Sequence, residues 1–86
     1  MRLDQFLKET RIIKRRTVAK QMSDDGFVFV FGKKVKASYD VKVEDEIEIF
    51  FKQKKIKYKV LDIPKKGTRK DEANKYYELL GEEYYE

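Results

Sequence analysis

Alternation between apolar and polar residues over positions 46–60 limits the possible folds more than any other feature of the sequence. Isoleucine alternates with glutamate in EIEIF, and after a lysine-rich turn apolar residues alternate with lysine in IKYKV. A period of two puts every second side chain on the same face of a β-strand, so each strand has one apolar and one polar face. The segment therefore predicts an antiparallel hairpin.

An earlier segment, FVFVFGKKVKA from Phe27, predicts another hairpin. Its β-branched and aromatic residues favour a strand, and Gly32-Lys33-Lys34 is the expected turn before a short return strand. Alternation puts three phenylalanines on one face of the first strand and two valines on the other.

Two short helices are expected before the strands. Apolar residues recur at i, i+3 and i+4 in RLDQFLKE, which predicts a helix with one apolar face. Similar spacing in VAKQM predicts a second helix from about Arg15 to Asp25, ended by Gly26. We expect the following residues to face the sheet: Leu3, Phe6, Leu7, Ile13, Ala19 and Met22.

The C-terminal part predicts a third helix. Pro64 and Gly67 interrupt the strand pattern, and the apolar spacing from Ala73 to Leu80 then predicts a helix that ends at Gly81, followed by a frayed tail at 82–86. The expected fold class is α+β. Two N-terminal helices pack on a small, mainly antiparallel sheet of two hairpins, with a C-terminal helix added.

Length and composition narrow the possible functions. A chain of 86 residues forms one domain, because two halves would each be too small to bury a core. The chain contains no Cys and no His, which excludes disulfides, thiol nucleophiles and the commonest acid–base group. No apolar run approaches the roughly 20 residues of a membrane span, and no signal-peptide core is present. We therefore expect a cytoplasmic protein that does not enter the membrane.

The formal net charge of +5 is concentrated in the first part of the chain. Residues 1–36 contain ten Lys or Arg against four Asp or Glu, residues 37–63 contain six against six, and residues 64–86 contain five against six. This distribution indicates a localised binding surface.

Much of that charge lies in KETRIIKRRTVAK, residues 8–20. A solvated face and an anion-binding face are equally good interpretations of such a run by itself. Three features favour anion binding. The run is rich in arginine, which suits phosphate contacts, and Glu9 is its only acidic residue. Arg15 and Arg16 also stand at the expected start of a helix, where they oppose the helix dipole unless an anion binds there.

Four motifs in this order resemble the RNA-binding domain named after ribosomal protein S-four. They are RLDxxL from Arg2, KRRTxA from Lys14, GxVxVxG from Gly26 and VxxxDxI from Val41. The resemblance covers roughly residues 1–60 and implies a two-helix unit on a small sheet that binds structured RNA through the basic face of its helices. Residues 61–86 are expected to complete a strand and to add a helix and tail that pack on, or extend, the same domain.

The whole chain is similar to a bacterial subgroup, the RqcP-type relatives of heat-shock protein fifteen. The similarity rests on the initial MRLD, on KRRT and on KDEANxY near the C-terminus. It implies binding to a large ribosomal subunit obstructed by peptidyl-tRNA, in support of a partner protein that elongates the trapped chain with untemplated alanine. The implied partners are large-subunit ribosomal RNA, tRNA and this elongation protein, and we expect the chain itself to be a monomer.

The resemblance also implies roles for single residues. Arg2, Arg16 and their basic neighbours would contact ribosomal RNA and tRNA, and Asp4 would orient an arginine. Two turns depart from the family pattern. Phe31 stands where many members have Asn, and Val43-Glu44-Asp45 replaces a common Pro-Gly-Asp, which puts the shape of both turns in question. The predicted RNA-binding residues are Arg2, Lys8, Arg11, Lys14, Arg15, Arg16, Lys20, Lys33, Lys34 and Lys36.

Other groups of residues carry weaker signals. The three lysines at 33–36 fit a phosphate contact and the protection of a sheet edge equally well. Those at 52–59 are expected to be solvated, and the acids at 44–48 alternate on a strand, so they do not converge on a metal.

A binding module without catalytic residues, metal or cofactor is favoured over an enzyme, because the sequence offers no nucleophile–base pair and no glycine loop for phosphates. The alternative is a protein-interaction adaptor that uses the aromatic hairpin or the C-terminal helix, with the basic face only keeping it in solution.

Overall fold

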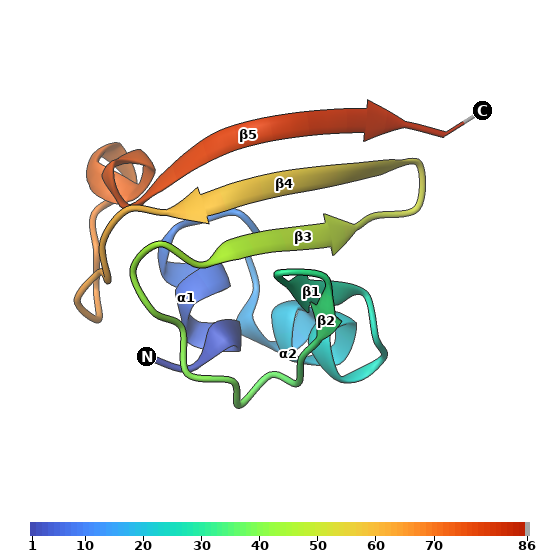
Figure 1. The fold of residues 1–86 in the computed structure, drawn as a ribbon. Helices are drawn as coiled ribbons and strands as arrows, with labels where there is room; N and C mark the ends of the chain where they lie inside the picture. Colours follow the sequence, from blue (N-terminus) through green and yellow to red (C-terminus); the bar gives the residue numbers. More distant parts are fainter. Residues whose placement is uncertain (86) are drawn as a thin grey trace.

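The computed structural model describes residues 1–85, which form an antiparallel five-stranded sheet with helices packed on one face (Figure 1). The strand order is β2-β1-β3-β4-β5. The helices are α1 (Leu3–Glu9), α2 (Arg16–Asp24) and the 3-10 helix η1 (Lys70–Tyr76), and the strands are β1 (Val28–Val30), β2 (Lys33–Lys34), β3 (Glu46–Phe50), β4 (Lys54–Val60) and β5 (Tyr77–Tyr84). The expected α+β class is confirmed.

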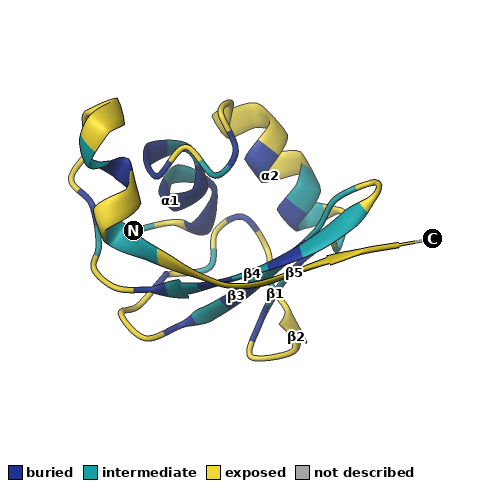
Figure 2. Cartoon of the chain, turned by 90° about the horizontal axis from the view of Figure 1, so that it is seen from above, coloured by how far each residue is buried: buried dark blue, intermediate teal, exposed yellow. Residues whose placement is uncertain are grey.

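The core lies between the helices and the inner face of the sheet, where Figure 2 shows the buried residues gathered. Leu3, Phe6 and Leu7 are fully buried in α1 and pack with Ile47 and Ile49 of β3. Full burial of a side chain of this size stabilises the fold by about 1.5–3 kcal/mol. Ile13 and Ala19 are buried as predicted, while Met22 is partly buried against the same core.

The turn between β1 and β2 differs from the prediction. Lys33 and Lys34 are not in the turn but form β2, and the connection is the two-residue loop Phe31-Gly32. Both loop residues have positive φ, 49° at Phe31 and 77° at Gly32, as a type I′ turn requires. The pair Asn-Gly is the usual sequence signal for this turn, and because Phe31 stands in place of the asparagine, the turn was not recognised at Phe31-Gly32.

The C-terminal helix prediction is wrong beyond Tyr76. Instead of continuing as a helix, residues from Tyr77 pair with β4 along its whole length, from Val60 back to Lys54. The hydrogen-bonding groups on this side of β4 would otherwise lack backbone partners, and pairing with β5 satisfies them. The expected frayed tail is also wrong up to Tyr85, whose N–H donates to the Gln53 carbonyl at 3.1 Å. Residue 86, also assigned to that tail, lies outside the described residues.

Within residues 1–85, no helix has the length and apolar character required to cross a membrane.

The first prediction concerns Phe31, which has a strained backbone in the loop between β1 and β2. Phe31 is 61% exposed, so its ring contributes little packing, and its left-handed backbone is unfavourable for a phenylalanine. We expect Phe31→Asn to raise the free energy of unfolding by about 0.5–1 kcal/mol, since asparagine followed by glycine is the preferred pair in this turn. Urea unfolding measures the change. Phe31→Leu is the matched control and should give no gain; an equal gain from leucine would mean that loss of the ring, not the backbone, explains the effect.

Candidate nucleic-acid interface

A buried carboxylate joins the starts of α1 and α2. Asp4 is only 2% exposed, and its two oxygens contact the Nε atoms of two arginines, Oδ1 with Arg2 at 3.2 Å and Oδ2 with Arg16 at 3.4 Å. Asp4 Oδ1 also accepts the Gln5 N–H at 2.9 Å. The expectation that Asp4 orients an arginine therefore holds, and the carboxylate orients two.

Both arginines remain about half exposed, Arg2 at 47% and Arg16 at 48%. Each contacts Asp4 through Nε, and no hydrogen bond from the terminal amino groups of either guanidinium is formed within residues 1–85, so these groups can donate to an external acceptor. A hollow of about 340 Å³ lies between them, lined by Arg2, Asp4, Arg16, Thr17 and Lys20. Paired arginine forks with a nearby lysine are suited to an anion with several acceptor oxygens, such as an RNA phosphate.

The start of α2 adds further donors at this position. Arg16 is the first residue of the helix, and Arg15 before it has an extended backbone and makes no side-chain capping hydrogen bond. The first turn of α2 also contains no acidic residue. The first backbone N–H groups of the helix therefore have no side-chain acceptor in the part of the chain that the structure describes, and the positive end of the helix dipole favours an anion there.

The remaining predicted residues of the 8–20 segment divide into two groups. Lys8 lies 3.7 Å from Glu9 and Lys20 lies 3.0 Å from Asp24, so these two, like Arg16, have acidic partners. Because Glu9 is the only acidic residue of the run, its bases were expected not to be balanced by local salt bridges. This is wrong for all three, since Asp4 and Asp24 approach Arg16 and Lys20 from outside the run and Glu9 pairs with Lys8 within it. Within residues 1–85, no ion pair is formed by Arg11, Lys14 or Arg15.

Asp24 links Lys36 to the end of α2. Its carboxylate accepts the Ala37 N–H at 2.9 Å and contacts Lys20, while its backbone carbonyl accepts from Lys36 Nζ at 3.2 Å. The hydrogen bond from Ala37, followed by that from Lys20, lowers the pKa of Asp24 below its usual value. Lys36 is thus held near Lys20.

Lys33 and Lys34 instead lie on the edge strand β2 and do not line the hollow. Their position suits protection of the sheet edge as well as a phosphate contact. Thr17 lines the hollow although it is not among the predicted residues; its place directly after Arg16 in the KRRT motif is the signal that could have found it.

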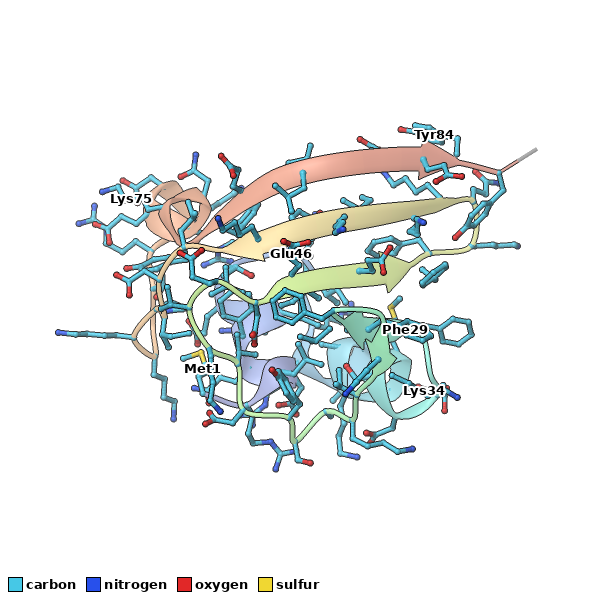
Figure 3. The ribbon with its side chains drawn as sticks, in the orientation of Figure 1. Met1, Phe29, Lys34, Glu46, Lys75 and Tyr84 are labelled. Atoms are coloured by element: carbon cyan, nitrogen blue, oxygen red, sulfur yellow. The ribbon has the colours of Figure 1, made fainter. Side chains whose placement is uncertain are left out.

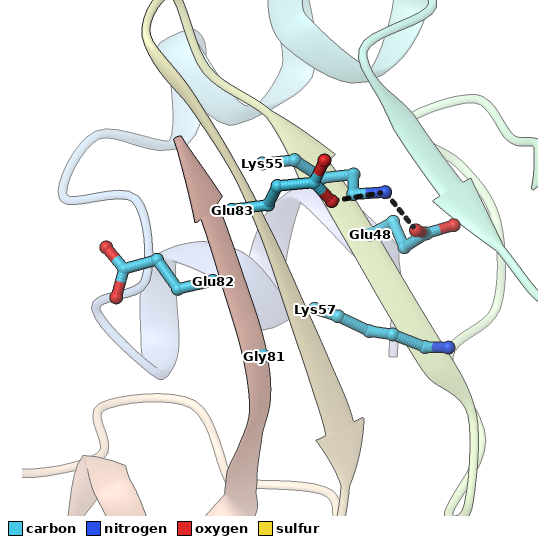
Figure 4. A pocket seen from close by; sticks show the side chains of 6 residues that line it. All are labelled: Glu48, Lys55, Lys57, Gly81, Glu82 and Glu83. Carbon is cyan, nitrogen blue, oxygen red and sulfur yellow. Dashed lines mark ion pairs between the residues drawn. The ribbon is translucent and has the colours of Figure 1, made fainter. Parts of the chain in front are cut away.

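The outer face of the sheet carries paired charges. Lys57 contacts Glu46 at 3.1 Å and Lys59 contacts Glu44 at 3.0 Å, which raises the pKa of Lys59. Figure 4 shows Lys55 between Glu48 and Glu83 beside a hollow at Gly81. Glu44, Glu46 and Glu48 therefore neutralise lysines, whereas Asp45 is buried and accepts from the Tyr39 hydroxyl and the Lys42 N–H. Among residues 1–85 no cluster of three acidic side chains could hold a metal ion.

Comparison with known proteins identifies the family. The S4 domain model matches residues 1–47. The RQC P-site tRNA stabilizing factor of Streptococcus pneumoniae is 49% identical over 82 residues, which cover 95% of this chain and 92% of that protein. The factor of the same name from Bacillus subtilis is 47% identical over 83 residues, covering 96% and 95%. The chain belongs to the S4 domain family, in the group of these factors.

A solved structure supports the assignment of the fold. The trimeric structure of Vibrio cholerae Heat Shock Protein 15 superposes on this S4 domain protein with a TM-score of 0.84 at 24% identity, covering 94% of this chain and 82% of that one. The resemblance inferred from the four sequence motifs is therefore confirmed.

The shared carboxylate generates the second prediction. Arg2→Ala or Arg16→Ala alone leaves Asp4 with one guanidinium, and each should lower the free energy of unfolding by about 0.5–1 kcal/mol, as expected for a half-exposed pair. The double variant leaves the buried Asp4 carboxylate with the Gln5 N–H as its one donor among residues 1–85. We expect its loss to exceed the sum of the single losses by about 0.5–1 kcal/mol. Urea titration of all four proteins measures this coupling, and simple additivity would show that Asp4 does not link the arginines energetically.

Proposed function

We propose that the protein binds the large ribosomal subunit, contacts ribosomal RNA and tRNA there, and acts in the quality control of stalled translation in the cytoplasm. The observation that carries the proposal is the pair of half-exposed arginines held by one buried carboxylate. The names of the relatives support tRNA as a partner, since these proteins are called P-site tRNA stabilizing factors.

The site favours the phosphate backbone of a structured RNA. Arg2 directly precedes α1 and Arg16 begins α2, so their relative position is set by the fold and by Asp4 before any ligand binds. Such preorganisation lowers the side-chain entropy that ordering would otherwise cost on binding. Contacts of this kind position a protein on RNA without reading its bases, so recognition depends on the shape of the RNA.

The protein then acts by binding, without catalysis. A small domain that contacts ribosomal RNA and tRNA at the same time raises the effective concentration of each for the other and slows the loss of the tRNA. We propose that this retention assists a partner protein that adds alanine to the C-terminus of the trapped chain. The predicted basic residues other than Arg2 and Arg16 would extend the contact: Lys8, Arg11, Lys14, Arg15, Lys20, Lys33, Lys34 and Lys36.

A second candidate function rests on an exposed aromatic surface. Phe27, Phe50 and Phe51 line, with Met22 and Lys52, a hollow of about 480 Å³. In Figure 3, the aromatic residues Phe29 and Tyr84 lie at the end of the sheet away from Lys75. An apolar hollow with one lysine suits a protein segment, which supports an adaptor role in which the basic face only keeps the chain in solution.

Salt dependence separates the two candidates. If about four to six lysines or arginines replace counterions on RNA, the logarithm of the affinity for large subunits should fall with the logarithm of the salt concentration, with a slope of roughly −3 to −5. Binding titrations over a series of potassium chloride concentrations measure the slope. A flat response would favour the adaptor.

The proposed site also predicts which basic residue matters. Arg16→Ala should weaken binding to large subunits bearing peptidyl-tRNA by on the order of 1–3 kcal/mol, the value for a charged hydrogen bond. Lys57→Ala is the control, because Lys57 lies on the outer face of the sheet and is paired with Glu46. Cosedimentation measures binding, and thermal melting checks that both variants are folded. Equal binding by the two folded variants would remove the support for this site.

A further inference from the structure

A basic loop from the C-terminal part of the chain is fastened to the end of α1. The Glu9 carboxylate is 5% exposed, and its Oε2 accepts the N–H groups of Gly67 and Thr68, both at 3.1 Å. Figures 1 and 2 show the segment that leads into η1 on the same side of the sheet as α1. A contact between residues almost sixty positions apart thus fixes where the loop lies.

The loop has a defined shape of its own. Pro64 is buried where the loop begins, Gly67 adopts a φ of 82°, and the Thr68 hydroxyl donates to the Lys65 carbonyl. These contacts use the backbone and the threonine, and leave the side chains of Lys65 and Lys66 exposed. Neither lysine forms an ion pair with any residue in the range 1–85.

Arg11, just beyond the end of α1, has an energetically unfavourable backbone conformation. It follows the C-cap residue of α1 and has a φ of 60°, the left-handed conformation in which glycine is usual at this position. A non-glycine residue there is strained, because its Cβ comes too close to the following carbonyl oxygen. The Arg11 N–H donates to the Lys8 carbonyl at 3.0 Å, but its side chain is exposed and forms no hydrogen bond or ion pair within residues 1–85.

These cations adjoin, along the chain, either Glu9 or the loop that it binds, and one carboxylate cannot neutralise them all. Arg11 follows Glu9 by two residues, which places their Cα atoms within roughly 7 Å, and Lys66 directly precedes Gly67, which Glu9 binds. Lys8 already lies 3.7 Å from Glu9 Oε1. The charges of Arg11, Lys65 and Lys66 therefore remain uncompensated within residues 1–85, and an external polyanion would relieve their mutual repulsion.

We propose that Arg11, Lys65 and Lys66 form a second RNA-backbone surface, and that Glu9 is the positioning residue that holds the loop in it. The loop lies outside residues 1–47, which match the S4 domain model, so the surface adds to that domain. It lies at the opposite end of α1 from Asp4, with a rise of about 7.5 Å from Asp4 to Glu9 at 1.5 Å per residue, and therefore reaches different phosphates from those at the Arg2–Arg16 hollow. This inference rests on the proposed function.

Removal of the two lysines is the direct test. We expect the double variant Lys65→Ala, Lys66→Ala to bind large subunits bearing peptidyl-tRNA on the order of tenfold more weakly, and its log–log salt slope to be smaller in magnitude by roughly 2. The matched control is Lys57→Ala, Lys59→Ala, which removes the same charge from the outer face of the sheet and should change neither quantity strongly. Wild-type affinity and slope in the Lys65, Lys66 variant would overturn the proposal.

Two further variants separate binding from folding. Arg11→Gly should be at least as stable as the wild type, because glycine suits the left-handed backbone, and yet bind more weakly. Glu9→Ala should release the loop and weaken binding although both lysines are retained, and Glu9→Gln should restore part of the affinity because its amide oxygen can still accept an N–H. If Glu9→Ala does not fold, the lysine and Arg11 variants decide alone.

Failure of this inference can be distinguished from failure of the proposed function. If the wild type binds and Arg16→Ala weakens binding, but the loop and Arg11 variants bind normally, only the second surface is wrong. If the wild type does not bind these subunits, or binds without salt dependence, the proposed function fails and the second surface fails with it.

Discussion

Burial of one face of α1 against the sheet is the interaction on which the rest of the structure depends. Leu3, Phe6 and Leu7 fill the space over β3 and β4, so the rotation of this short helix about its axis is fixed. That rotation buries two carboxylates near its ends. Asp4 then holds two arginines and Glu9 holds the loop that precedes η1. Core packing thus determines where the exposed cations lie, although none of them belongs to the core.

The non-glycine residues with a strained, left-handed backbone differ in how far their other contacts compensate the strain. Arg11, Phe31 and Glu44 have positive φ without being glycine, and all three are exposed. Glu44 is partly compensated, because its N–H donates to the Val60 carbonyl at 2.9 Å and its carboxylate meets Lys59. The Arg11 N–H likewise donates to the Lys8 carbonyl at 3.0 Å, but its side chain has no acidic partner in the described part of the chain. A strained residue whose charged side chain is left unpaired is where a functional explanation is most useful.

The spacing of apolar residues along the chain predicted those helices and strands whose apolar residues face the core. The apolar faces of α1 and α2 and the alternation over 46–60 were sufficient for the class and for most of the core. The C-terminal segment was not predictable in this way, because the Tyr- and Leu-rich sequence after Ala73 suits a helix as well as a strand. The segment forms a strand because the edge of β4 is free to pair with it, and a short stretch of sequence carries no information about that edge.

The candidate site was predictable to a similar degree. The KRRT motif and the arginine content pointed to the Arg16 end of the candidate site, and family resemblance gave the expectation that Asp4 orients an arginine. What the sequence could not provide is the pairing of distant segments: Arg2 with Arg16 through Asp4, and Glu9 with Gly67 and Thr68. Both pairings use buried carboxylates, which in a sequence look like ordinary members of a charged helix. In so highly charged a chain, acids that are buried and hydrogen-bonded are therefore the better guide to a basic site than the basic residues themselves, because they determine which cations are held together and which are left free for a ligand.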